Sequence, residues 1–396
     1  MELKDVVVVA ANRSPMGLFG GTLKEIPAYD LGGQVIQKTL ERAGLKPEDI
    51  DMTVFGNCRQ AGNGVNPART AAQKAGIPMD RYAQTVNCAC PTGLKATIIA
   101  SQDIRLGDAE VVVAGGMESM STIPHLVMGH RWSGFRLGNV TIMDGWYDTL
   151  DRIVNLGMGQ TAENVAEKYG ISREDQDGFA FRSHRKASQT QKAGSFKEEI
   201  VPVDVPGSKK QEGFVFSEDE CIRHDADLEK MGTLSPVFKE GGTVTAANAC
   251  GMPDGAAALI VTSRERAKSL GTAPLFSIVS YSNAAVDNAY MGIGPTVSIP
   301  IALERAGLTT GDIDAFEINE AFAATSLACE RTLGIDPEKV NIHGGAIALG
   351  HPTGCSGARL LVTLYHVIAQ QDKEIGAAAL CGGGGVSCAM IIKREK

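Results

Sequence analysis

Short apolar runs alternate with stretches of helical periodicity along the chain. The runs are typical of buried strands, and the periodic stretches place an apolar residue every three or four positions, as helices do. The expected strands are residues 6–11, 111–114, 254–261, 275–280 and 377–380, and the expected helices include 29–43, 160–168, 298–306 and one that begins at the N-cap Ser172. Glycines are expected to end two strands, at Gly115-Gly116 and at 382–385. This alternation predicts an α/β fold with parallel or mixed sheets covered by helices.

The second half of the chain repeats the first. Leu-Glu-Arg-Ala-Gly-Leu at residues 40–45 returns at 303–308, and Asp-Ile-Asp follows both copies in the same register. Further on, Cys90 stands before Pro-Thr-Gly in one copy and His351 stands before Pro-Thr-Gly in the other, each at the start of an apolar helical stretch. Two copies related by a pseudo-two-fold axis would bring these helix starts to one cleft and pair a thiol with an imidazole.

The length of 396 residues implies more than one domain. A single hydrophobic core usually stops growing at about 250–300 residues. We assign residues 1–120, completed by 250–272, to an N-terminal half and residues 273–396 to a C-terminal half. Residues 121–249 differ in character, because they hold both tryptophans and many charges, and we interpret them as an inserted domain.

The composition is that of a globular enzyme and argues against several other classes. The formal net charge of −8 argues against nucleic acid as a partner. No apolar run reaches the ~18–20 residues that span a bilayer, and no signal peptide or lipidation motif is expected. The nine cysteines are scattered without the spacing of a metal finger, which is typical of free thiols in a reducing compartment. A cytoplasmic protein without a metal site or a membrane contact is therefore expected.

Three residues are candidates for covalent and acid–base chemistry. Cys90 lies just before a helix, where N–H groups and the helix dipole favour the thiolate. His351 has the matching place in the second copy, among glycines that leave room for a ligand. Cys381 ends a buried strand and precedes four glycines, whose N–H groups could line an oxyanion hole. A structural cysteine and a core histidine are the ordinary alternatives, but the matched positions of thiol and imidazole favour a nucleophile and its base.

Together with further blocks, these motifs resemble the thiolase family of acetyl-CoA acetyltransferases and 3-oxoacyl-CoA thiolases over essentially the whole chain. The blocks are Asn87-x-x-Cys90-x-x-Gly93-Leu94, Gly115-Gly116-Met117-Glu118-Ser119-Met120, Gly159-x-Thr161-Ala162-Glu163-Asn164, Asp254-Gly255-Ala256-Ala257, Asn319-Glu320-Ala321-Phe322, Gly350-His351-Pro352 and Cys381-x-Gly383-Gly384-Gly385. The resemblance implies two similar halves in a five-layer α-β-α-β-α fold with an inserted loop domain, assembled as a homodimer or a homotetramer. It also implies reversible Claisen condensation of acetyl-CoA and CoA-dependent thiolysis of 3-oxoacyl-CoA through a cysteine acyl-enzyme.

The resemblance further implies roles for individual residues. Cys90 would accept the acyl group, His351 would activate it as a base, and Cys381 would move the proton on the substrate α-carbon. Asn319 would hold a water that, with His351, binds the enolate oxygen, and the N–H groups of Cys90 and Gly383 would form a second oxyanion hole. The residues implied to contact coenzyme A are Arg223, Cys250, Met158, Ala249, Ala321, Phe322 and Met291. No metal or redox cofactor is implied, because the CoA thioesters are substrates.

Three positions depart from the usual residues of the family. Pro91, after the nucleophile, has no N–H to offer but pre-sets φ at the helix start. Gly157 stands where a histidine is common, and Cys250 stands where a serine is usual. Loss of an imidazole and of a hydroxyl predicts a roomier or less polar acyl–pantetheine end of the pocket, with tolerance of acyl groups longer than acetoacetyl or a weaker hold on CoA.

Two other functions share parts of this pattern. A 3-oxoacyl synthase condenses irreversibly on the same fold, but it uses a second histidine where this chain has Cys381. A non-catalytic acyl-CoA-binding protein would lack a catalytic side chain, whereas all four are present here. Acyl chain length, biosynthetic or degradative direction, and dimer or tetramer stay open. Cys90, Cys381 and Cys88 are expected to share one cleft, so mild oxidation could join two of them.

Overall fold

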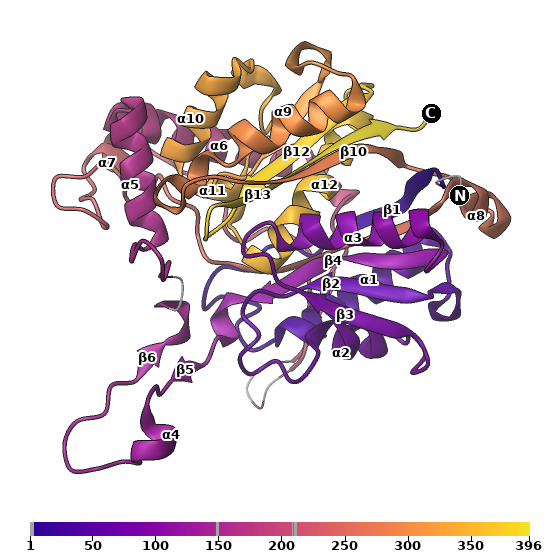
Figure 1. The fold of residues 1–396 in the computed structure, drawn as a ribbon, viewed down its shortest axis with the longest axis horizontal. Helices are drawn as coiled ribbons and strands as arrows, with labels where there is room; N and C mark the ends of the chain where they lie inside the picture. The colour runs from indigo at the N-terminus through magenta and orange to yellow at the C-terminus, as the bar shows by residue number, and fades with distance from the viewer. Residues whose placement is uncertain (1–3, 148–149, 208, 210–211) are drawn as a thin grey trace.

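Nine strands form one hydrogen-bonded sheet in the computed structural model, which describes residues 4–147, 150–207, 209 and 212–396 (Figure 1). These strands are β1 (Val6–Arg13), β2 (Met52–Gly56), β3 (Tyr82–Val86), β4 (Val111–Ser119), β9 (Asp254–Ser263), β10 (Phe276–Ala285), β11 (Ala315–Ile318), β12 (Ile375–Cys381) and β13 (Val386–Arg394). Strand β2 is parallel to β3 and β4, and β11 is parallel to β12, while the other neighbours are antiparallel. The predicted α/β class with a mixed sheet is confirmed.

The sheet consists of two copies of one strand order. The first half runs β3-β2-β4-β9-β1, and the second runs β11-β12-β13-β10. The two copies meet where β1 pairs with β10 at a short antiparallel seam that includes Val8 and Phe276. Beyond β11, an isolated parallel bridge between Phe316 and Val340 stands where β3 stands beside β2. The repeat inferred from the sequence is therefore also a repeat in structure.

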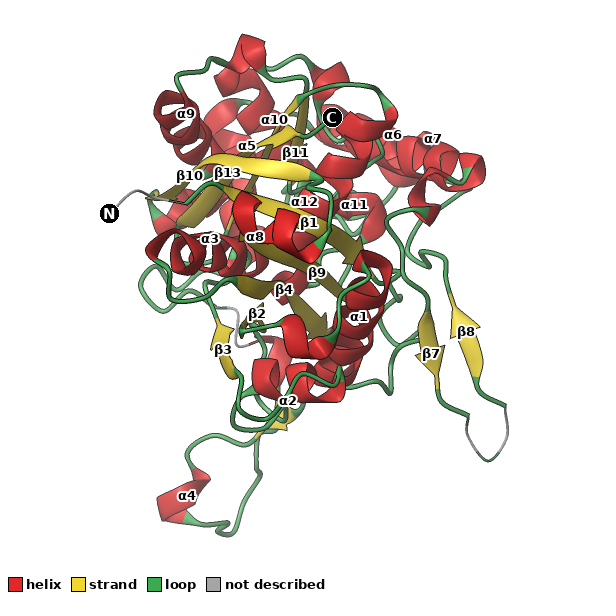
Figure 2. Ribbon diagram, turned by 90° about the vertical axis from the view of Figure 1, so that its right-hand side faces the viewer, coloured by secondary structure: helices red, strands yellow, loops and turns green. Residues whose placement is uncertain are grey.

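Helices cover the outer faces of both halves and fill the space between them (Figure 2). The helices are α1 (Ala28–Ala43), α2 (Pro67–Lys74), α3 (Thr92–Leu106), α4 (His130–Ser133), α5 (Met158–Tyr169), α6 (Arg173–Ala193), α7 (Leu228–Gly232), α8 (Arg264–Leu270), α9 (Pro295–Ala306), α10 (Ala323–Leu333), α11 (Ala346–Leu349) and α12 (Thr353–Gln370). Helices α3 and α12 pack together and share one apolar core with strands of both halves. Helices α1 and α2 cover the outer face of the first half, and α9 covers that of the second. The predicted five-layer α-β-α-β-α arrangement is confirmed.

Strand β4 differs from its sequence-based prediction. It does not stop at Gly115-Gly116 but runs through both glycines to Ser119, so that prediction is wrong. The glycines serve close approach instead of chain termination. A Cβ at Gly115 would collide with the Ala257 carbonyl oxygen on β9, and a Cβ at Gly116 would collide with the Gly354 carbonyl oxygen at the start of α12. Gly116 thus lets α12 lie directly on the sheet, and Gly115 lets β4 lie close to β9.

Helix ends follow the capping signals in the sequence. Helix α1 ends at Gly44, which has φ +66°, as predicted. Helix α6 begins after Ser172, whose hydroxyl accepts the N–H of Asp175 at 3.1 Å. Helix α9 begins at Pro295, earlier than the predicted residue 298, because proline fits the first helical position.

Residues 121–249 contribute an arm, a hairpin and three helices. The arm, residues 123–144, contains β5 (His125–Leu126), α4 and β6 (Met143–Asp144) and extends from the body (Figure 1). The hairpin pairs β7 (Val203–Val205) with β8 (Phe214–Phe216). Helices α5, α6 and α7 share an apolar core with α10 of the second half. Within the described ranges, we find no helix with the length and hydrophobicity needed to cross a membrane.

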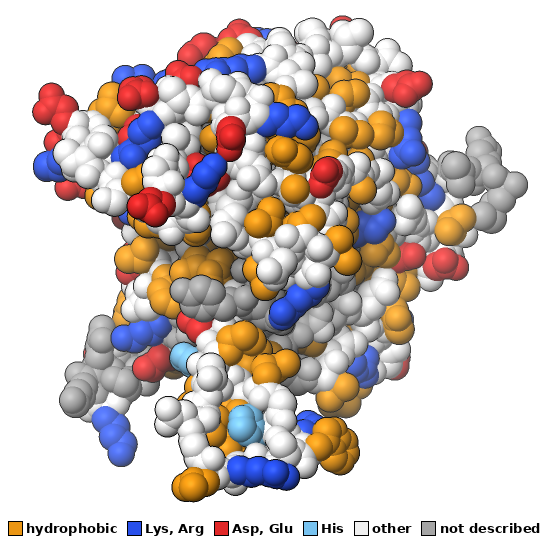
Figure 3. All heavy atoms as spheres, turned by 60° about the vertical axis from the view of Figure 1, so that its left-hand side comes forward, with side chains coloured by type: hydrophobic (Ala, Val, Ile, Leu, Met, Phe, Trp, Pro, Cys, Tyr) orange, Lys and Arg blue, Asp and Glu red, His pale blue; other side chains and the backbone are white. Residues whose placement is uncertain are grey.

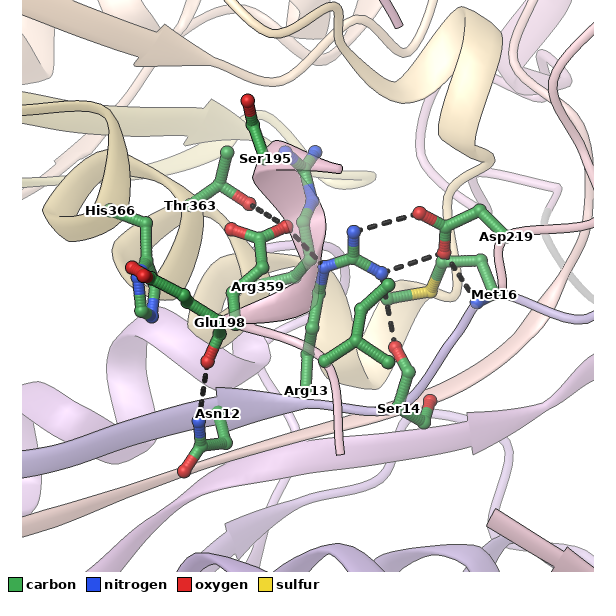
Figure 4. Close-up of polar contacts among 12 residues, drawn as sticks. Asn12, Arg13, Ser14, Met16, Ser195, Glu198, Asp219, Arg359, Thr363 and His366 are labelled. Carbon is green, nitrogen blue, oxygen red and sulfur yellow. Dashed lines mark hydrogen bonds and ion pairs between the residues drawn. The ribbon is translucent and has the colours of Figure 1, made fainter. Parts of the chain in front are cut away.

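A buried ion network ties β1 to residues 199 and 219 of this segment (Figure 4). Arg13 is fully buried and donates from Nε to Glu199 Oε1 at 2.7 Å. Its Nη1 and Nη2 donate to the two carboxylate oxygens of Asp219 at 2.7 and 2.8 Å. Burial disfavours the charged guanidinium, but Asp219 and Glu199 together raise the pKa of Arg13 above its ordinary value. The bidentate geometry fixes how the segment lies against the first half.

We expect Asp219→Ala to lower the free energy of unfolding by about 3–5 kcal/mol, because it leaves the buried Arg13 charge with half of its partners. The matched control is Asp175→Ala, which breaks an Asp175–Arg331 ion pair of the same 2.7 Å length at the surface. That change should cost at most about 1 kcal/mol. Denaturant unfolding followed by circular dichroism measures both values. Equal losses in the two variants would contradict the importance of burial here.

Candidate active site

The first turns of α3 and α12 meet between the two halves. A Cβ at Gly93 in α3 would lie 3.1 Å from the Gly354 carbonyl oxygen in α12, and a Cβ at Gly56, at the end of β2, would lie 3.0 Å from the same oxygen. Larger side chains at these positions would push the helices apart. The two Pro-Thr-Gly motifs, with Cys90 and His351 before them, therefore lie at one place, as the repeat predicts.

His351 is buried immediately before α12, after a turn that favours glycine. Gly350 has φ +86°, and a Cβ there would collide with Pro253. The main-chain N–H of His351 donates to the Gly251 carbonyl oxygen at 3.0 Å. The turn at Gly350 and this main-chain hydrogen bond fix the backbone that carries the imidazole.

Ser356 selects the tautomer of His351. Its hydroxyl lies 2.6 Å from His351 Nδ1 and 3.0 Å from the Pro352 carbonyl oxygen. A carbonyl can only accept and the hydroxyl has one hydrogen, so Ser356 donates to Pro352 and accepts from Nδ1–H. Nε2 is then the basic nitrogen. Burial, helped by Arg359, lowers the pKa of His351 to about 3, so the imidazole is neutral at pH 7.

Asn319 lies beside this imidazole, directly after β11. Its Nδ2 is 3.4 Å from His351 Nε2. Its main-chain N–H donates to the Ala379 carbonyl oxygen at 3.0 Å, which holds it at the end of the sheet. Its Oδ1 is buried and has no hydrogen-bond partner among the residues that the structure describes. The side chain therefore offers an amide oxygen next to the histidine.

Cys90 lies in a tight loop between β3 and α3. Ala89 before it has φ +52°, and Asn87 supports this turn by accepting the Ala89 N–H at 3.1 Å. Burial raises the pKa of the Cys90 thiol, although the N–H groups of Gly383 and of Cys90 itself, together with Arg59, favour the thiolate. The N–H groups at the helix start favour the thiolate, as the sequence suggested, but burial outweighs them. The thiol needs a base.

Cys381 is the last residue of β12 and is buried near Cys90. Burial raises its pKa well above the ordinary value, and the interaction with Cys90 raises it further. The glycine run then brings the main chain against the nucleophile loop, since a Cβ at Gly382 would lie 2.5 Å from Pro91 Cδ. Gly383 lies next to Met158, whose sulfur would be 3.2 Å from a Cβ there. A larger residue at 382 would overlap Pro91, whereas a larger residue at 383 would require Met158 to shift.

Cys381 also belongs to a small apolar cluster. Most of the residues implied to contact coenzyme A lie in it. Its members are Cys381, Ala162, Val244, Met291, Ala321 and Phe322, with Met158 and Ala249 packed against them. Phe238 meets the Phe322 ring edge-on, with ring centroids 6.1 Å apart. The main-chain N–H of Cys250 donates to the Ala321 carbonyl oxygen at 3.1 Å. Burial is the main cause that raises the pKa of Cys250 to about 12, and the neighbouring Cys90 adds to it.

Arg223 lies outside this cluster, in a pocket with about 430 Å³ of empty space. Ala249 and Gly350 line the same pocket, so it extends from Arg223 to the main chain beside His351. The main-chain N–H of Arg223 donates to His184 Nδ1 at 3.2 Å. Burial is the main cause that lowers the pKa of His184 to about 4, and the charges of Arg223 and His224 add to it. This histidine is therefore neutral at pH 7. The pocket thus combines a guanidinium with a mostly uncharged wall.

Glu118 is a supporting residue that the sequence analysis did not identify. It is buried at the end of β4, and its Oε2 accepts the Thr353 hydroxyl and the Gly354 N–H, both at 2.9 Å, and the Cys58 N–H at 3.0 Å. Burial raises its pKa, and these hydrogen bonds oppose that rise. One carboxyl group thus connects the first half to the helix that follows His351. Glu118 lies in one of the sequence motifs that resemble the family, but the sequence does not indicate which residues donate hydrogen bonds to it.

Asp151 was also missed. Its carboxylate accepts the Asn288 side-chain amide at 2.8 Å and the main-chain N–H of Gly384. It therefore supports the glycine run from outside. Within the described part of the chain, no three histidine, cysteine, aspartate or glutamate side chains group in a way that could hold a metal ion.

Comparison with known proteins covers both halves of the chain. Residues 6–265 match the family described as thiolase, N-terminal domain, and residues 272–394 match thiolase, C-terminal domain. An acetyl-CoA acetyltransferase of Cupriavidus necator is 50% identical over 398 residues, which cover 99% of this chain and 100% of that protein. A probable acetyl-CoA acyltransferase of Staphylococcus aureus is 48% identical, with 99% of each chain covered.

Solved structures show the same likeness. The Bacillus anthracis acetyl-CoA acetyltransferase has a TM-score of 0.97 and 44% identity, with 100% of both chains covered. A human mitochondrial 3-ketoacyl-CoA thiolase in complex with CoA has a TM-score of 0.95 and 40% identity, with 100% of this chain and 99% of that chain covered. The matches extend through both halves that build the site, and the chain belongs to the thiolase family.

Proposed function

We propose that this protein is an acyl-CoA:acyl-CoA C-acyltransferase that condenses acetyl-CoA reversibly and cleaves 3-oxoacyl-CoA with CoA. The observation that carries the proposal is the meeting of Cys90, His351 and Cys381 where two helix starts and one strand end come together. Relatives and structural neighbours named acetyl-CoA acetyltransferase support the acetyl group as one substrate. The three side chains supply an acyl acceptor and two bases, so the proposal includes no resident cofactor.

In the first half-reaction, Cys90 attacks the thioester. His351 Nε2 takes the thiol proton, sulfur adds to the carbonyl carbon, and the N–H groups of Cys90 and Gly383 stabilise the oxyanion. The bond between the carbonyl carbon and the CoA sulfur then breaks, the CoA thiolate takes the proton from the imidazolium, and the acyl group stays on Cys90. The low pKa of His351 supports this return, because a buried imidazolium releases its proton readily.

In the second half-reaction, the Cys381 thiolate removes an α-proton from a second acetyl-CoA. A water held by the free Oδ1 of Asn319 donates its other hydrogen to the enolate oxygen, and His351 adds a second donor there only while its Nε2 carries a proton. The enolate carbon attacks the acyl carbonyl, a C–C bond forms, and the C–S bond to Cys90 breaks. The Cys90 thiolate then recovers a proton from Cys381. The raised pKa of Cys381 makes its thiolate a strong base.

The pocket between Arg223 and Gly350 is assigned to the CoA arm. Arg223 offers a cation for phosphate at one end, and the other end opens beside His351. Met158, Met291 and Phe322 are assigned to the acyl and pantetheine walls, because they pack around Cys381. A structural neighbour solved in complex with CoA supports this ligand class.

The test is CoA-dependent thiolysis of acetoacetyl-CoA, which is monitored through the loss of the enolate absorbance. The rate is then compared with those for six- and ten-carbon 3-oxoacyl-CoA. We expect CoA-dependent decay with acetyl-CoA as product. Condensation without any reverse thiolysis would instead indicate a 3-oxoacyl synthase. Binding of acyl-CoA without turnover would indicate a non-catalytic protein.

We predict that Gly157→His raises the preference for acetoacetyl-CoA over a six-carbon 3-oxoacyl-CoA. Gly157 precedes α5, and a Cβ there would contact only Gln160 Oε1, at 3.7 Å, so the position has room for a side chain. An imidazole would occupy space beside Met158 and narrow the acyl end. The ratio of kcat/KM for the two substrates measures the effect. Gly157→Ala is the control and should leave the ratio near its starting value, whereas an unchanged ratio in the histidine variant would contradict the prediction.

A homodimer or homotetramer in the cytoplasm completes the proposal. The arm (residues 123–144) exposes Trp132, Phe135 and Leu137, and Trp132 is 93% exposed. In Figure 3, hydrophobic side chains stand among basic and polar ones on the protrusion at the bottom of the view. Large apolar side chains exposed on one projecting segment are typical of a protein–protein contact. Strand β3 adds an open edge that can pair with another chain. Light scattering of the full chain measures the assembly.

All nine cysteines are free thiols, which supports a reducing compartment.

A further inference from the structure

The threonines of the two Pro-Thr-Gly motifs carry buried hydroxyl groups that the proposed chemistry does not use. Thr92 Oγ1 accepts the main-chain N–H of Cys88 at 2.7 Å. Thr353 Oγ1 donates to Glu118 Oε2 at 2.9 Å. One threonine thus holds the loop before the nucleophile, and the other holds the helix start after the base.

Cys58, which follows β2, contacts the nucleophile loop at three points. Its sulfur lies 3.0 Å from the Ala89 carbonyl oxygen and 3.2 Å from Thr92 Oγ1. A carbonyl oxygen can only accept, so the single S–H hydrogen goes to Ala89 and the sulfur accepts the Thr92 hydroxyl. The main-chain carbonyl oxygen of Cys58 accepts the Asn87 side-chain amide at 3.1 Å. These three partners flank Cys90 on both sides, so Cys58 holds the loop as a unit.

Ala89 is the residue of this loop that needs such support. It has φ +52°, a backbone conformation that a residue with a Cβ adopts rarely. Its carbonyl oxygen accepts both the Cys58 S–H and the main-chain N–H of Thr92, the latter at 3.1 Å. Its own N–H donates to Asn87 Oδ1 at 3.1 Å. Because Cys90 follows directly, any relaxation of Ala89 moves the nucleophile.

Glu118 connects Cys58 to the start of α12. Its Oε2 accepts the main-chain N–H of Cys58 at 3.0 Å and that of Gly354 at 2.9 Å. Its Oε1 accepts the Asn57 side-chain amide at 2.6 Å and the main-chain N–H of Arg59 at 3.1 Å. A continuous set of hydrogen bonds therefore runs from the nucleophile loop, through the segment after β2, to the helix that follows the base.

We propose that Thr92, Cys58 and Glu118 are positioning residues, which together hold the Cys90 sulfur at a fixed place relative to His351. They act through the loop and the helix start, and none of them exchanges a proton or forms a bond with the acyl group. Loss of this link lets the loop relax, and a misplacement of about 1 Å can cost about 10²-fold in rate. The pocket assigned to the CoA arm is lined by none of the three residues, so CoA binding stays unchanged. This inference rests on the proposed function.

The experiment compares Thr92→Val with Thr92→Ser in the full-length protein. Valine keeps the shape of the side chain but removes the hydroxyl, which leaves the Cys88 N–H without its acceptor. We expect the single-turnover acetylation of Cys90 by acetyl-CoA, and kcat for thiolysis, to fall about 10–10²-fold in Thr92→Val. KM for CoA should stay near the wild-type value. Thr92→Ser keeps the hydroxyl and should restore most of the rate.

Two further variants sharpen the comparison. Thr97→Val is the matched control, because Thr97 is also fully buried in α3 and its hydroxyl donates to the Gly93 carbonyl oxygen of the same helix at 3.1 Å. It should acetylate Cys90 at the wild-type rate. Cys58→Ala should lower the acetylation rate about 3–10-fold, the size expected for one lost hydrogen bond. Combined with Thr92→Val, it should lose less than the product of the two single losses, because both changes act on one loop.

Three results would overturn the proposal. They are wild-type acetylation by Thr92→Val, equal losses in Thr92→Val and Thr92→Ser, and a lower melting temperature of Thr92→Val with an unchanged rate per folded molecule. Absence of thiolysis in the wild-type protein would instead refute the proposed function. Alkylation of Cys90 by iodoacetamide, followed by peptide mapping, would then still test the link, since it should be slower in Thr92→Val than in Thr92→Ser.

Discussion

Cys90→Ala should abolish acyl-enzyme formation and reduce both condensation and thiolysis by about 10³–10⁶-fold, as loss of a covalent nucleophile does. The main-chain N–H groups of Gly383 and of Cys90 itself hydrogen-bond the Cys90 sulfur, which places this sulfur where the proposed oxyanion hole would act. Brief exposure of the wild-type protein to acetyl-CoA, followed by peptide mass mapping, should place the acetyl group on Cys90.

The neighbouring Cys88 provides the matched control. Cys88→Ser removes a thiol only two residues away from Cys90. Cys90 in this variant should still be acetylated at the wild-type rate. Acetyl label on Cys88 or Cys381 in the wild-type protein would refute the assignment of Cys90. Retained CoA binding by Cys90→Ala would separate a chemical defect from a folding defect.

Cys381→Ala should separate the two half-reactions. Acetylation of Cys90 should persist, whereas condensation should fall by about 10²–10⁴-fold, the usual contribution of a general acid or base. The reason is position: Cys381 is buried next to Cys90 but is not the sulfur that the Gly383 N–H contacts. Hydrogen–deuterium exchange of the acetyl protons of acetyl-CoA in D₂O isolates the proton-transfer step. Exchange at the wild-type rate in Cys381→Ala would exclude Cys381 as the base.

Much of the fold could be predicted because it rests on local patterns and on an internal repeat. The apolar runs became strands because both faces of the sheet are covered, and the Gly44 and Ser172 signals marked real helix ends. The repeat placed Cys90 and His351 together without any knowledge of the intervening chain. The division at residues 121–249 and the roles of the site residues stay predictions.

The remaining features depend on contacts between distant residues. In the sequence, Gly116 indicated the end of a strand. In the structure, its missing side chain lets α12, which is distant in the sequence, contact the strand. Glu118 gained its partners Thr353 and Gly354 only when the two halves packed together. The pKa of Cys90 also follows from burial, which a helix start in the sequence cannot reveal.

The placement of Cys90 and His351 at matching positions constrains how such a site can arise. Two identical halves assembled as a symmetric pair would present the same residue twice, so they would offer two thiols or two imidazoles. A thiol beside an imidazole requires copies that mutate independently while remaining bound to each other. Covalent fusion of the halves provides both conditions, because each position is then encoded once. A single chain that holds both copies can therefore encode a chemically asymmetric centre that a symmetric pair of identical halves cannot.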